Sequence, residues 1–268
     1  MGYQWDWYST DFYGLGHSEE VVTRALAAWS GPRPLVFTKC TMVWDDAGNI
    51  DYPDSKKSIR AEVEASLRRL QIDVIDLYQM HWPDDDLAGS LEAWTVMAEL
   101  KKEGKVRHLS VSNFDVAELS AAAEIAPVIS LQPPYSLLSR DIETEMFPHC
   151  LAHDIGVINY SPMGSGIFSG AMTRERIASL PSNDWRNNSP NFQEPRLTEH
   201  LAIADRLTDV GARHGQSAGA TAIAWTLRQP VVTGAIVGAR SPAQVEGFIG
   251  ALNYRLTPAE ITYIESGT

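Results

Sequence analysis

The fold is decided by the stretch Val74-Ile75-Asp76-Leu77-Tyr78-Gln79-Met80, a short run of β-branched, aliphatic and aromatic residues between two helix-like patterns. Runs of the same kind recur at residues 35–38, 106–111, 128–131, 157–160 and 235–237, with a weaker candidate at residues 3–8. Short strands that alternate with amphipathic helices form parallel sheets joined by crossover helices. The sequence therefore predicts an α/β fold with about seven strands.

The segment before this run has the pattern of a helix with one buried face. Ile59, Val63, Leu67 and Leu70 recur at steps of four, four and three residues. That spacing places the four side chains on one side of a helix, where they can pack against a sheet. We expect the other connections between strands to be helical as well.

Several helix ends are visible in the sequence. Asp115, Ser241 and Thr257 each stand three residues before a Glu or Gln, which is the pattern of a helix N-cap. Gly104 and Gly156 each follow a helical segment, at a place where glycine commonly ends a helix. These signals predict three helix starts and two helix ends.

This alternation is compatible with a closed (β/α)8 barrel or with an open doubly wound sheet. A dinucleotide-binding doubly wound sheet carries G-x-G-x-x-G in its first strand-to-helix turn, and the sequence has no such motif there. Its main glycine cluster, residues 164–170, follows a late strand, where barrels place active-site loops. We expect one (β/α)8 TIM barrel domain over residues 1–268, with residues 170–197 as a functional lid or mobile loop.

Composition narrows the function classes. The chain has 22 basic and 34 acidic residues, a formal net charge of −12, which disfavours nucleic acid and anionic membranes as partners. The only cysteines, Cys40 and Cys150, are too few for a disulfide framework and lack the spacing of a zinc site. No signal peptide and no membrane-spanning run is present. We therefore expect a cytoplasmic protein in which both thiols are buried or incidental.

Three ionisable residues stand at or just after predicted strand ends: Tyr13, Lys39 and His81. In a barrel such positions converge at one mouth. Carbonyl reduction needs a proton donor; a nearby cation such as Lys39 can lower the pKa of a tyrosine, and a neutral imidazole can orient the substrate oxygen. Each residue taken alone also has a plain interpretation, as a packing tyrosine or as a solvated polar group. No metal is required by this chemistry.

The surroundings of these three residues resemble the aldo-keto reductase family from about Asp11 to the C-terminus. Residues 11–20 are similar to the family segment that contains the catalytic Tyr, here Tyr13. Residues 37–40 resemble the strand with the catalytic Lys, here Lys39, and residues 76–83 resemble the strand with the catalytic His, here His81. The resemblance implies an NADP-dependent oxidoreductase that reduces an aldehyde, ketone or sugar carbonyl, or oxidises the alcohol.

The cofactor-binding stretches of the family are matched as well. The resemblance implies that Ser112, Asn113 and Gln132 hold the nicotinamide carboxamide, and that Tyr160 stacks on the nicotinamide ring. The loop after it is expected to clamp the pyrophosphate, through Ser161, Pro162, Met163, Gly164, Ser165 and Gly166.

A last match follows the final predicted strand. The resemblance places Gly238 and Arg240 at the cofactor, with Arg240 against the adenosine 2′-phosphate, a contact to which a guanidinium is suited. Gln244 has two interpretations, since it either contacts the cofactor or completes the helix cap that begins at Ser241. The substrate is a small carbonyl compound that the sequence does not specify, and the oligomeric state is left open.

The chain departs from the family pattern at its N-terminus. Family members have a glycine-rich first strand and a first helix before the segment that resembles residues 3–8, so we expect a barrel incomplete at its N-terminus. The family also places a catalytic Asp five residues before the Tyr, where this chain has Tyr8. The nearest acidic residue upstream of Tyr8 is Asp6. Two alternatives therefore stay open: a catalytically impaired or regulatory cofactor-binding protein, or a truncated gene product.

Overall fold

The structure is a computed structural model that describes residues 7–8, 14–45, 47–51, 55–84 and 86–266. The chain divides into two compact units. The first contains Met1–Pro133 and Glu145–Val157, and the second contains Pro134–Thr144 and Ile158–Thr268. The interpretation of residues 1–268 as one domain stays a prediction.

The first unit is built on parallel strands that pair in sequence order. They are β1 (Trp7–Tyr8), β2 (Val36–Cys40), β5 (Ile75–Met80), β6 (Val106–Ser112), β7 (Ser130–Gln132) and the start of β8 (Gly156–Tyr160). Each neighbouring pair in this order, from β1 to β8, is parallel. A doubly wound sheet reverses its strand order at a switch point, whereas a (β/α)8 barrel keeps sequence order. The predicted strands of this unit are thus confirmed, except that residues 3–6 of the weaker candidate at 3–8 lie outside the described residues, and the strand order agrees with the barrel.

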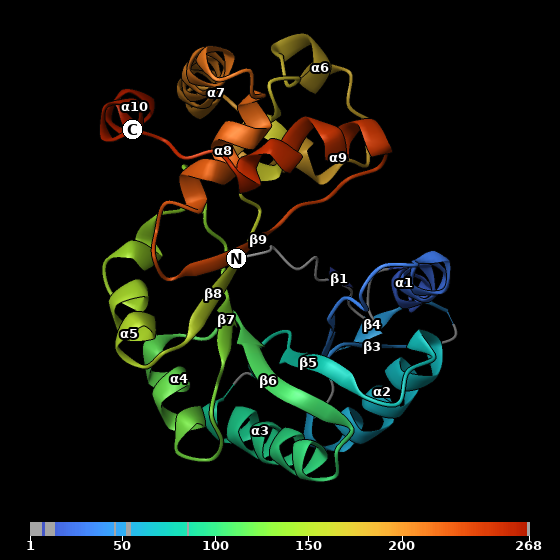
Figure 1. The fold of residues 1–268 in the computed structure, drawn as a ribbon. Helices are drawn as coiled ribbons and strands as arrows, with labels where there is room; N and C mark the ends of the chain where they lie inside the picture. The colour runs from blue at the N-terminus through green and yellow to red at the C-terminus, as the bar shows by residue number, and fades with distance from the viewer. Residues whose placement is uncertain (1–6, 9–13, 46, 52–54, 85, 267–268) are drawn as a thin grey trace. The chain divides into compact units, whose positions relative to one another are not determined.

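Helices cover one face of this sheet. Figure 1 shows them along its outer side: α1 (His17–Ala28), α2 (Ser55–Leu70), α3 (Leu87–Lys102), α4 (Val116–Ala123) and α5 (Met146–Ala152). Ile59, Val63 and Leu70 of α2 are fully buried, as their spacing predicted, whereas Leu67 is partly exposed. A short antiparallel hairpin, β3 (Val43–Trp44) with β4 (Ile50–Asp51), follows β2 and was not predicted.

Most of the predicted helix ends are found. Asp115 and Thr257 form complete capping boxes, and Gly104 follows α3 with a φ angle of 81°. The prediction for Gly156 was wrong, because this glycine begins β8. Asp154 takes the left-handed conformation after α5, with a φ angle of 55°, since a short polar side chain tolerates that region.

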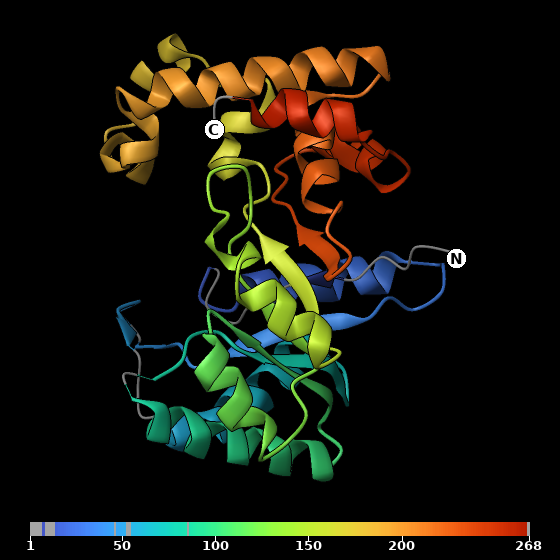
Figure 2. The ribbon, with the colours of Figure 1, turned by 90° about the vertical axis from the view of Figure 1, so that its left-hand side faces the viewer.

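The second unit is mainly helical. The end of β8 neighbours β9 (Val232–Ile236). In Figure 2 the long helix α7 (Arg196–Arg213) runs beside α10 (Pro258–Glu265), and these two helices contact each other. The remaining elements are α6 (Arg174–Ala178), α8 (Ala218–Thr226), α9 (Pro242–Ile249) and the short helices η1 (Asp141–Glu143), η2 (Gly164–Ser169), η3 (Trp185–Asn188), η4 (Pro190–Phe192) and η5 (Gly250–Leu252). Residues 170–197, expected to be a lid or loop, thus contain three short helices.

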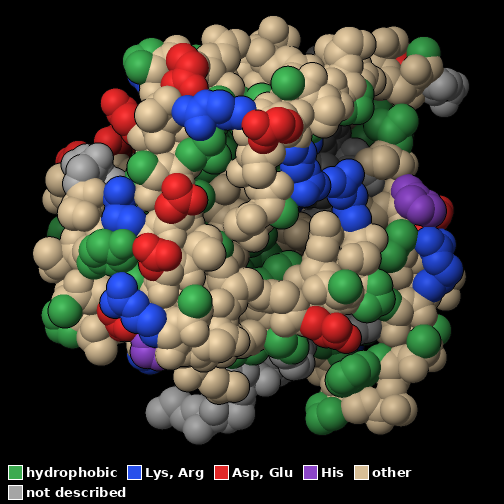
Figure 3. Space-filling model, turned by 90° about the horizontal axis from the view of Figure 1, so that it is seen from above, with side chains coloured by type: hydrophobic (Ala, Val, Ile, Leu, Met, Phe, Trp, Pro, Cys, Tyr) green, Lys and Arg blue, Asp and Glu red, His purple; other side chains and the backbone are tan. Residues whose placement is uncertain are grey.

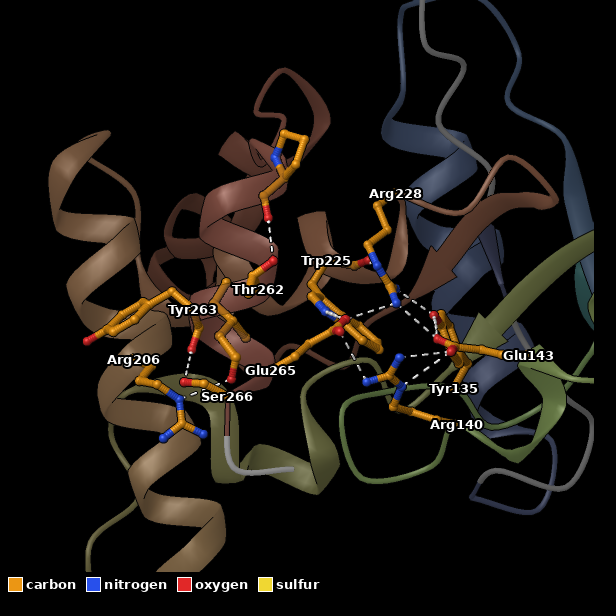
Figure 4. A network of polar contacts seen from close by, with 12 residues as sticks. Tyr135, Arg140, Glu143, Arg206, Trp225, Arg228, Thr262, Tyr263, Glu265 and Ser266 are labelled. Atoms are coloured by element: carbon orange, nitrogen blue, oxygen red, sulfur yellow. Dashed lines mark hydrogen bonds and ion pairs between the residues drawn. The ribbon is translucent and has the colours of Figure 1, made fainter.

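A network of aromatic and charged side chains holds the second unit together (Figure 4). Arg228 donates to the Tyr135 hydroxyl at 2.6 Å, to Glu143 at 3.0 Å and to Glu265 at 3.1 Å. Its guanidinium lies over the Trp225 ring, 3.7 Å from the centroid. Because Tyr135 and Glu143 precede α5 in sequence whereas Glu265 ends α10, one side chain joins distant segments of this unit.

The surface of the described residues carries both acidic and basic side chains. On the face drawn in Figure 3, Lys and Arg side chains lie in small groups among Asp and Glu side chains. Among the residues described, no helix combines the length and the apolar character that crossing a bilayer requires. Cys40 and Cys150 are both buried, as expected.

Candidate active site

The predicted residues of the first unit lie where neighbouring parallel strands end. Lys39 of β2 stands opposite Gln79 of β5, and Ser112 of β6 stands opposite Gln132 of β7. His81 directly follows β5. Since the carboxyl ends of parallel strands share one edge of a sheet, this register brings these residues to the edge where barrels carry their active sites.

Lys39 and His81 are the ionisable pair at this edge. Lys39 is 4% exposed, and the backbone N–H of His81 donates to the carbonyl oxygen of Cys40 at 3.1 Å. Burial, with the charge of Lys39 as a second cause, lowers the pKa of His81 to about 3. Its Nδ1 atom is buried and makes no hydrogen bond to the described residues. His81 is therefore neutral near pH 7 and can donate one N–H to a carbonyl oxygen.

The three predicted carboxamide ligands form one hydrogen-bonded group. Ser112 Oγ donates to the carbonyl oxygen of Gln132 at 2.8 Å and accepts from Asn113 Nδ2 at 3.1 Å. Asn113 Nδ2 also donates to the carbonyl oxygen of His81 at 3.1 Å, and Asn113 has a left-handed φ angle of 62°. Gln132 Nε2 donates to Gln79 Oε1 at 2.7 Å. Gln79, which the sequence analysis did not single out, thus fixes one of these ligands.

Two expected members of the site lie outside the described residues. These are Tyr13, the predicted proton donor, and Asp6, the nearest candidate for the carboxylate that the family pairs with Lys39. Their roles stay predictions. The described edge supplies the cation and the imidazole that the predicted chemistry needs beside a phenol.

In the second unit, the predicted pyrophosphate loop follows Tyr160 at the end of β8. Its backbone turns back on itself, since Gly164 N donates to Ser161 O and Gly166 N donates to Met163 O. Left-handed φ angles occur at Ser161 (56°), Gly164 (55°), Ser165 (56°) and Gly166 (100°). Pro162 is buried, and a Cβ atom on Gly164 would lie 3.0 Å from the Leu138 side chain. Such turns of successive left-handed residues make concave N–H surfaces that suit anions.

The segment after β9 is exposed. Gly238, Arg240 and Gln244 all face solvent in this unit. Gln244 Oε1 accepts from the backbone N–H of Arg240 at 2.6 Å, while the Ser241 side chain accepts from Gln244 N at 3.4 Å. Gln244 therefore braces the residue before the cap and does not close a full capping box. Gly238 has open space around its Cα, so nothing nearby requires glycine there.

Two charged residues beside the predicted phosphate loop were missed by the sequence analysis. Arg186 binds Asp184 through Nε at 2.8 Å and Nη2 at 2.6 Å. The remaining Nη1 lies 3.9 Å from the position that a Cβ on Gly166 would take. The hydrogen bonds from Arg186, with a further contribution from the charge of Arg240, lower the pKa of Asp184 to about 2. An Asp-x-Arg triplet in a stretch without periodicity gives no sequence signal.

These groups fit a nicotinamide dinucleotide in chemical character. In the first unit, hydroxyl and amide side chains suit a carboxamide, which needs both donors and acceptors. In the second unit, a left-handed backbone loop with the Arg186 guanidinium beside it suits phosphate oxygens.

Comparison with known protein families and sequences gives a consistent result. The model of the Aldo/keto reductase family matches residues 7–267. Aldo-keto reductase YhdN of Bacillus subtilis (strain 168) is 37% identical over 237 residues, covering 87% of this chain and 70% of that protein. The NADH-specific methylglyoxal reductase of Escherichia coli (strain K12) is 32% identical over 261 residues, covering 93% of this chain and 79% of that protein.

Solved structures agree with this result. The glycerol dehydrogenase AKR11B4 from Gluconobacter oxydans superposes with a TM-score of 0.88 at 36% identity, covering 97% of this chain and 79% of that one. The aldo-keto reductase AKR11C1 from Bacillus halodurans has a TM-score of 0.75 at 26% identity, covering 97% and 80%. Together with the parallel, sequence-ordered strands, these matches fit the (β/α)8 barrel that the sequence predicted.

Proposed function

The chain belongs to the aldo/keto reductase family, and on this premise we propose that it is an NADP-dependent oxidoreductase that interconverts a carbonyl compound and its alcohol. The observation that carries the proposal is the edge of the first unit, where Lys39 and a neutral His81 adjoin the Ser112–Asn113–Gln132 group. A cation that tunes the proton donor and an imidazole that orients the carbonyl oxygen are suited to carbonyl reduction at the barrel's carboxyl edge.

Each residue has a distinct role in the proposed reaction. The nicotinamide supplies or accepts the hydride. In the proposal Tyr13 gives a proton to the developing alkoxide, and Lys39 is the cation that stabilises the phenolate. His81 donates an N–H to the carbonyl oxygen and so orients it. General acid catalysis of this kind contributes roughly 10²- to 10⁴-fold to the rate.

We propose NADP as the cofactor because of the arginines in the second unit. Arg240 is exposed after β9, and Arg186 has a guanidinium nitrogen beside the predicted phosphate loop. Guanidinium groups favour the additional phosphate of NADP over the hydroxyl of NAD. Because the Escherichia coli relative is NADH-specific by name, both cofactors belong in every assay.

The substrate class follows from the relatives only in outline. A methylglyoxal reductase and a glycerol dehydrogenase are among them, which favours small oxygen-rich carbonyls and alcohols as the first compounds to assay. An anionic chain without a spanning helix among its described residues suits a cytoplasmic enzyme of small molecules.

The proposal is tested by binding first and turnover second. Titration of NADPH and NADH into the full chain should quench the fluorescence of its eight tryptophans, and a panel of small aldehydes and ketones should then oxidise the reduced cofactor. Lys39→Met should keep cofactor binding but lose turnover by roughly 10²-fold or more. Binding without turnover of any carbonyl would support the regulatory alternative, and a folded chain that binds neither cofactor would overturn the proposal.

A further inference from the structure

Thr41 lies directly after β2 in a conformation that threonine rarely adopts. Its φ angle is 81°, in the left-handed region where a β-branched side chain is strained. The residue is only 2% exposed. A strained backbone persists only where the surrounding contacts enforce it, and such residues cluster at functional sites. The contacts of Thr41 therefore indicate what the strain serves.

The Thr41 hydroxyl joins the ends of two neighbouring strands. Oγ1 accepts from the backbone N–H of Trp82 and donates to the carbonyl oxygen of Trp82, each at 3.3 Å. The adjacent residues are tied as well, by the backbone bond from His81 N to Cys40 O. Lys39 lies two residues before Thr41, and His81 directly precedes Trp82. The hydroxyl thus fastens the two chain segments that carry the predicted catalytic pair.

A buried carboxylate holds Thr41 from the helix side. Glu62 of α2 is 6% exposed, and its Oε2 accepts from the backbone N–H of Thr41 at 2.7 Å. Burying a carboxylate costs solvation energy, which a charge-assisted hydrogen bond partly offsets. Packing alone would be served by an apolar side chain, as at Val63 and Ile59 on the same helix. The carboxylate instead fixes the backbone of the strand end.

We propose that Thr41 and Glu62 are positioning residues, which together hold the ends of β2 and β5 so that Lys39 and His81 keep their relative placement. The inference rests on the proposed function, in which Lys39 and His81 both act at the proton-transfer step. Proton transfer depends on sub-ångström placement of its groups. Loosening this pair therefore lowers turnover while the fold and the cofactor site remain.

Thr41→Gly separates the two possible roles of Thr41. Glycine adopts the observed φ angle without strain, so the variant loses the hydroxyl while the fold is relieved. Relief of the strain and loss of the buried hydroxyl contacts act in opposite directions, so we expect a melting temperature within a few degrees of the wild type, together with a kcat that is roughly tenfold lower. The dissociation constant for NADPH should change by less than about twofold. Thr41→Ser keeps Oγ1 and should restore kcat to within about twofold of the wild type.

Gln71→Gly is the matched control. Gln71 also has a left-handed φ angle, 54°, and is exposed just after α2 in the same unit. It should relieve the same kind of backbone strain and keep the kcat of the wild type. If Thr41→Gly keeps the wild-type kcat, Thr41 is a structural residue and the inference is wrong. The inference is also wrong if kcat falls only because the variant is partly unfolded at the assay temperature, as a large drop in its melting temperature would show.

Two further measurements separate this inference from the proposed function. If the wild type turns over and Lys39→Met does not, the proposed function stands, and the Thr41 result judges the positioning pair alone. The NMR signal of the His81 imidazole gives a readout that needs no turnover. The signal should shift in Thr41→Gly and stay in place in Gln71→Gly. An unshifted signal in Thr41→Gly overturns the inference that Thr41 positions His81.

The role of Glu62 is tested by two substitutions. Glu62→Gln, which retains an acceptor oxygen, should keep a higher kcat than Glu62→Leu, and equal kcat values would show that Glu62 is not a positioning residue.

Discussion

At the scale of the residue, His81 shows how burial sets chemistry. An imidazole in water has a pKa of 6.5, whereas burial beside the charge of Lys39 lowers the pKa of His81 to about 3. The ring therefore stays neutral through the whole range in which an exposed histidine would gain a proton. A neutral ring can orient a carbonyl oxygen without competing with the proposed acid, Tyr13.

The same shift predicts how stability depends on pH. Between pH 6.5 and about 3, the unfolded chain binds a proton at His81 and the folded chain does not. The contribution of this residue to the free energy of unfolding is therefore complete above pH 6.5 and falls as the pH drops towards 3. Urea unfolding of the wild type and of His81→Asn at pH 7 and pH 4.5 measures this difference. The wild type should lose more stability than the variant, and equal losses would contradict the buried neutral ring.

Arg240 carries the residue-scale prediction about the cofactor. Arg240→Ala should weaken NADPH binding by roughly 10- to 100-fold and NADH binding by much less, because only NADPH offers the 2′-phosphate to a guanidinium. Fluorescence titration with both cofactors measures the two losses. Arg174→Ala is the control, since Arg174 is an exposed arginine of the same unit that pairs with Glu194. Equal losses of affinity for NADPH and NADH in Arg240→Ala would mean that the arginine does not bind the 2′-phosphate.

At the scale of the element, the loop after β8 depends on residues that can adopt left-handed φ angles. Gly166 has a φ angle of 100° and only ordinary contact distances around a built Cβ. Alanine would fit sterically but would strain the backbone by about 1–2 kcal/mol. We expect Gly166→Ala to lower the dinucleotide affinity several-fold, because the strained loop changes the direction of its N–H groups.

Gly104→Ala provides the comparison for this loop. Gly104 ends α3 with a φ angle of 81° and has open space around it, so alanine should cost a similar amount of stability there. Cofactor titration and thermal unfolding of both variants distinguish the two sites. If both variants lose stability equally and neither loses affinity, the loop after β8 does not contact the phosphates.

At the scale of the whole molecule, ion-pair networks differ in how far their side chains are shielded from water. Arg228→Met would remove one arginine that Glu143 and Glu265 share in the second unit, while Arg140 still pairs with both, and we expect it to cost about 2 kcal/mol. Arg60→Met removes a comparable arginine with two acidic partners on the surface of the first unit, where its side chain is 46% exposed, and should cost less than about 1 kcal/mol. Denaturant unfolding of the two variants measures both costs, and a similar cost for both would show that the network in Figure 4 is no more than a surface contact.

Local sequence patterns determined the strands, the helix with Ile59, Val63 and Leu70 on its buried face, and the capping boxes at Asp115 and Thr257. These features depend on side-chain periodicity and on hydrogen bonds within a few residues, which a sequence displays directly. The same patterns placed Lys39 and His81 at strand ends, because the change from an apolar run to a polar residue can be seen in the sequence itself. The left-handed φ angle of Asp154 was not predicted, because the helix was expected to end at Gly156 and glycine is the residue that most often adopts this conformation.

Only the tertiary structure decided which of these residues touch. Glu62 lies 21 positions from Thr41 and Gln132 lies 53 from Gln79, yet each pair is joined by a hydrogen bond. No local period links such positions, because their meeting depends on how helices pack and how strands register. The depressed pKa of His81 has the same origin, since the sequence contains the imidazole whereas the packed strand ends exclude the water that would charge it.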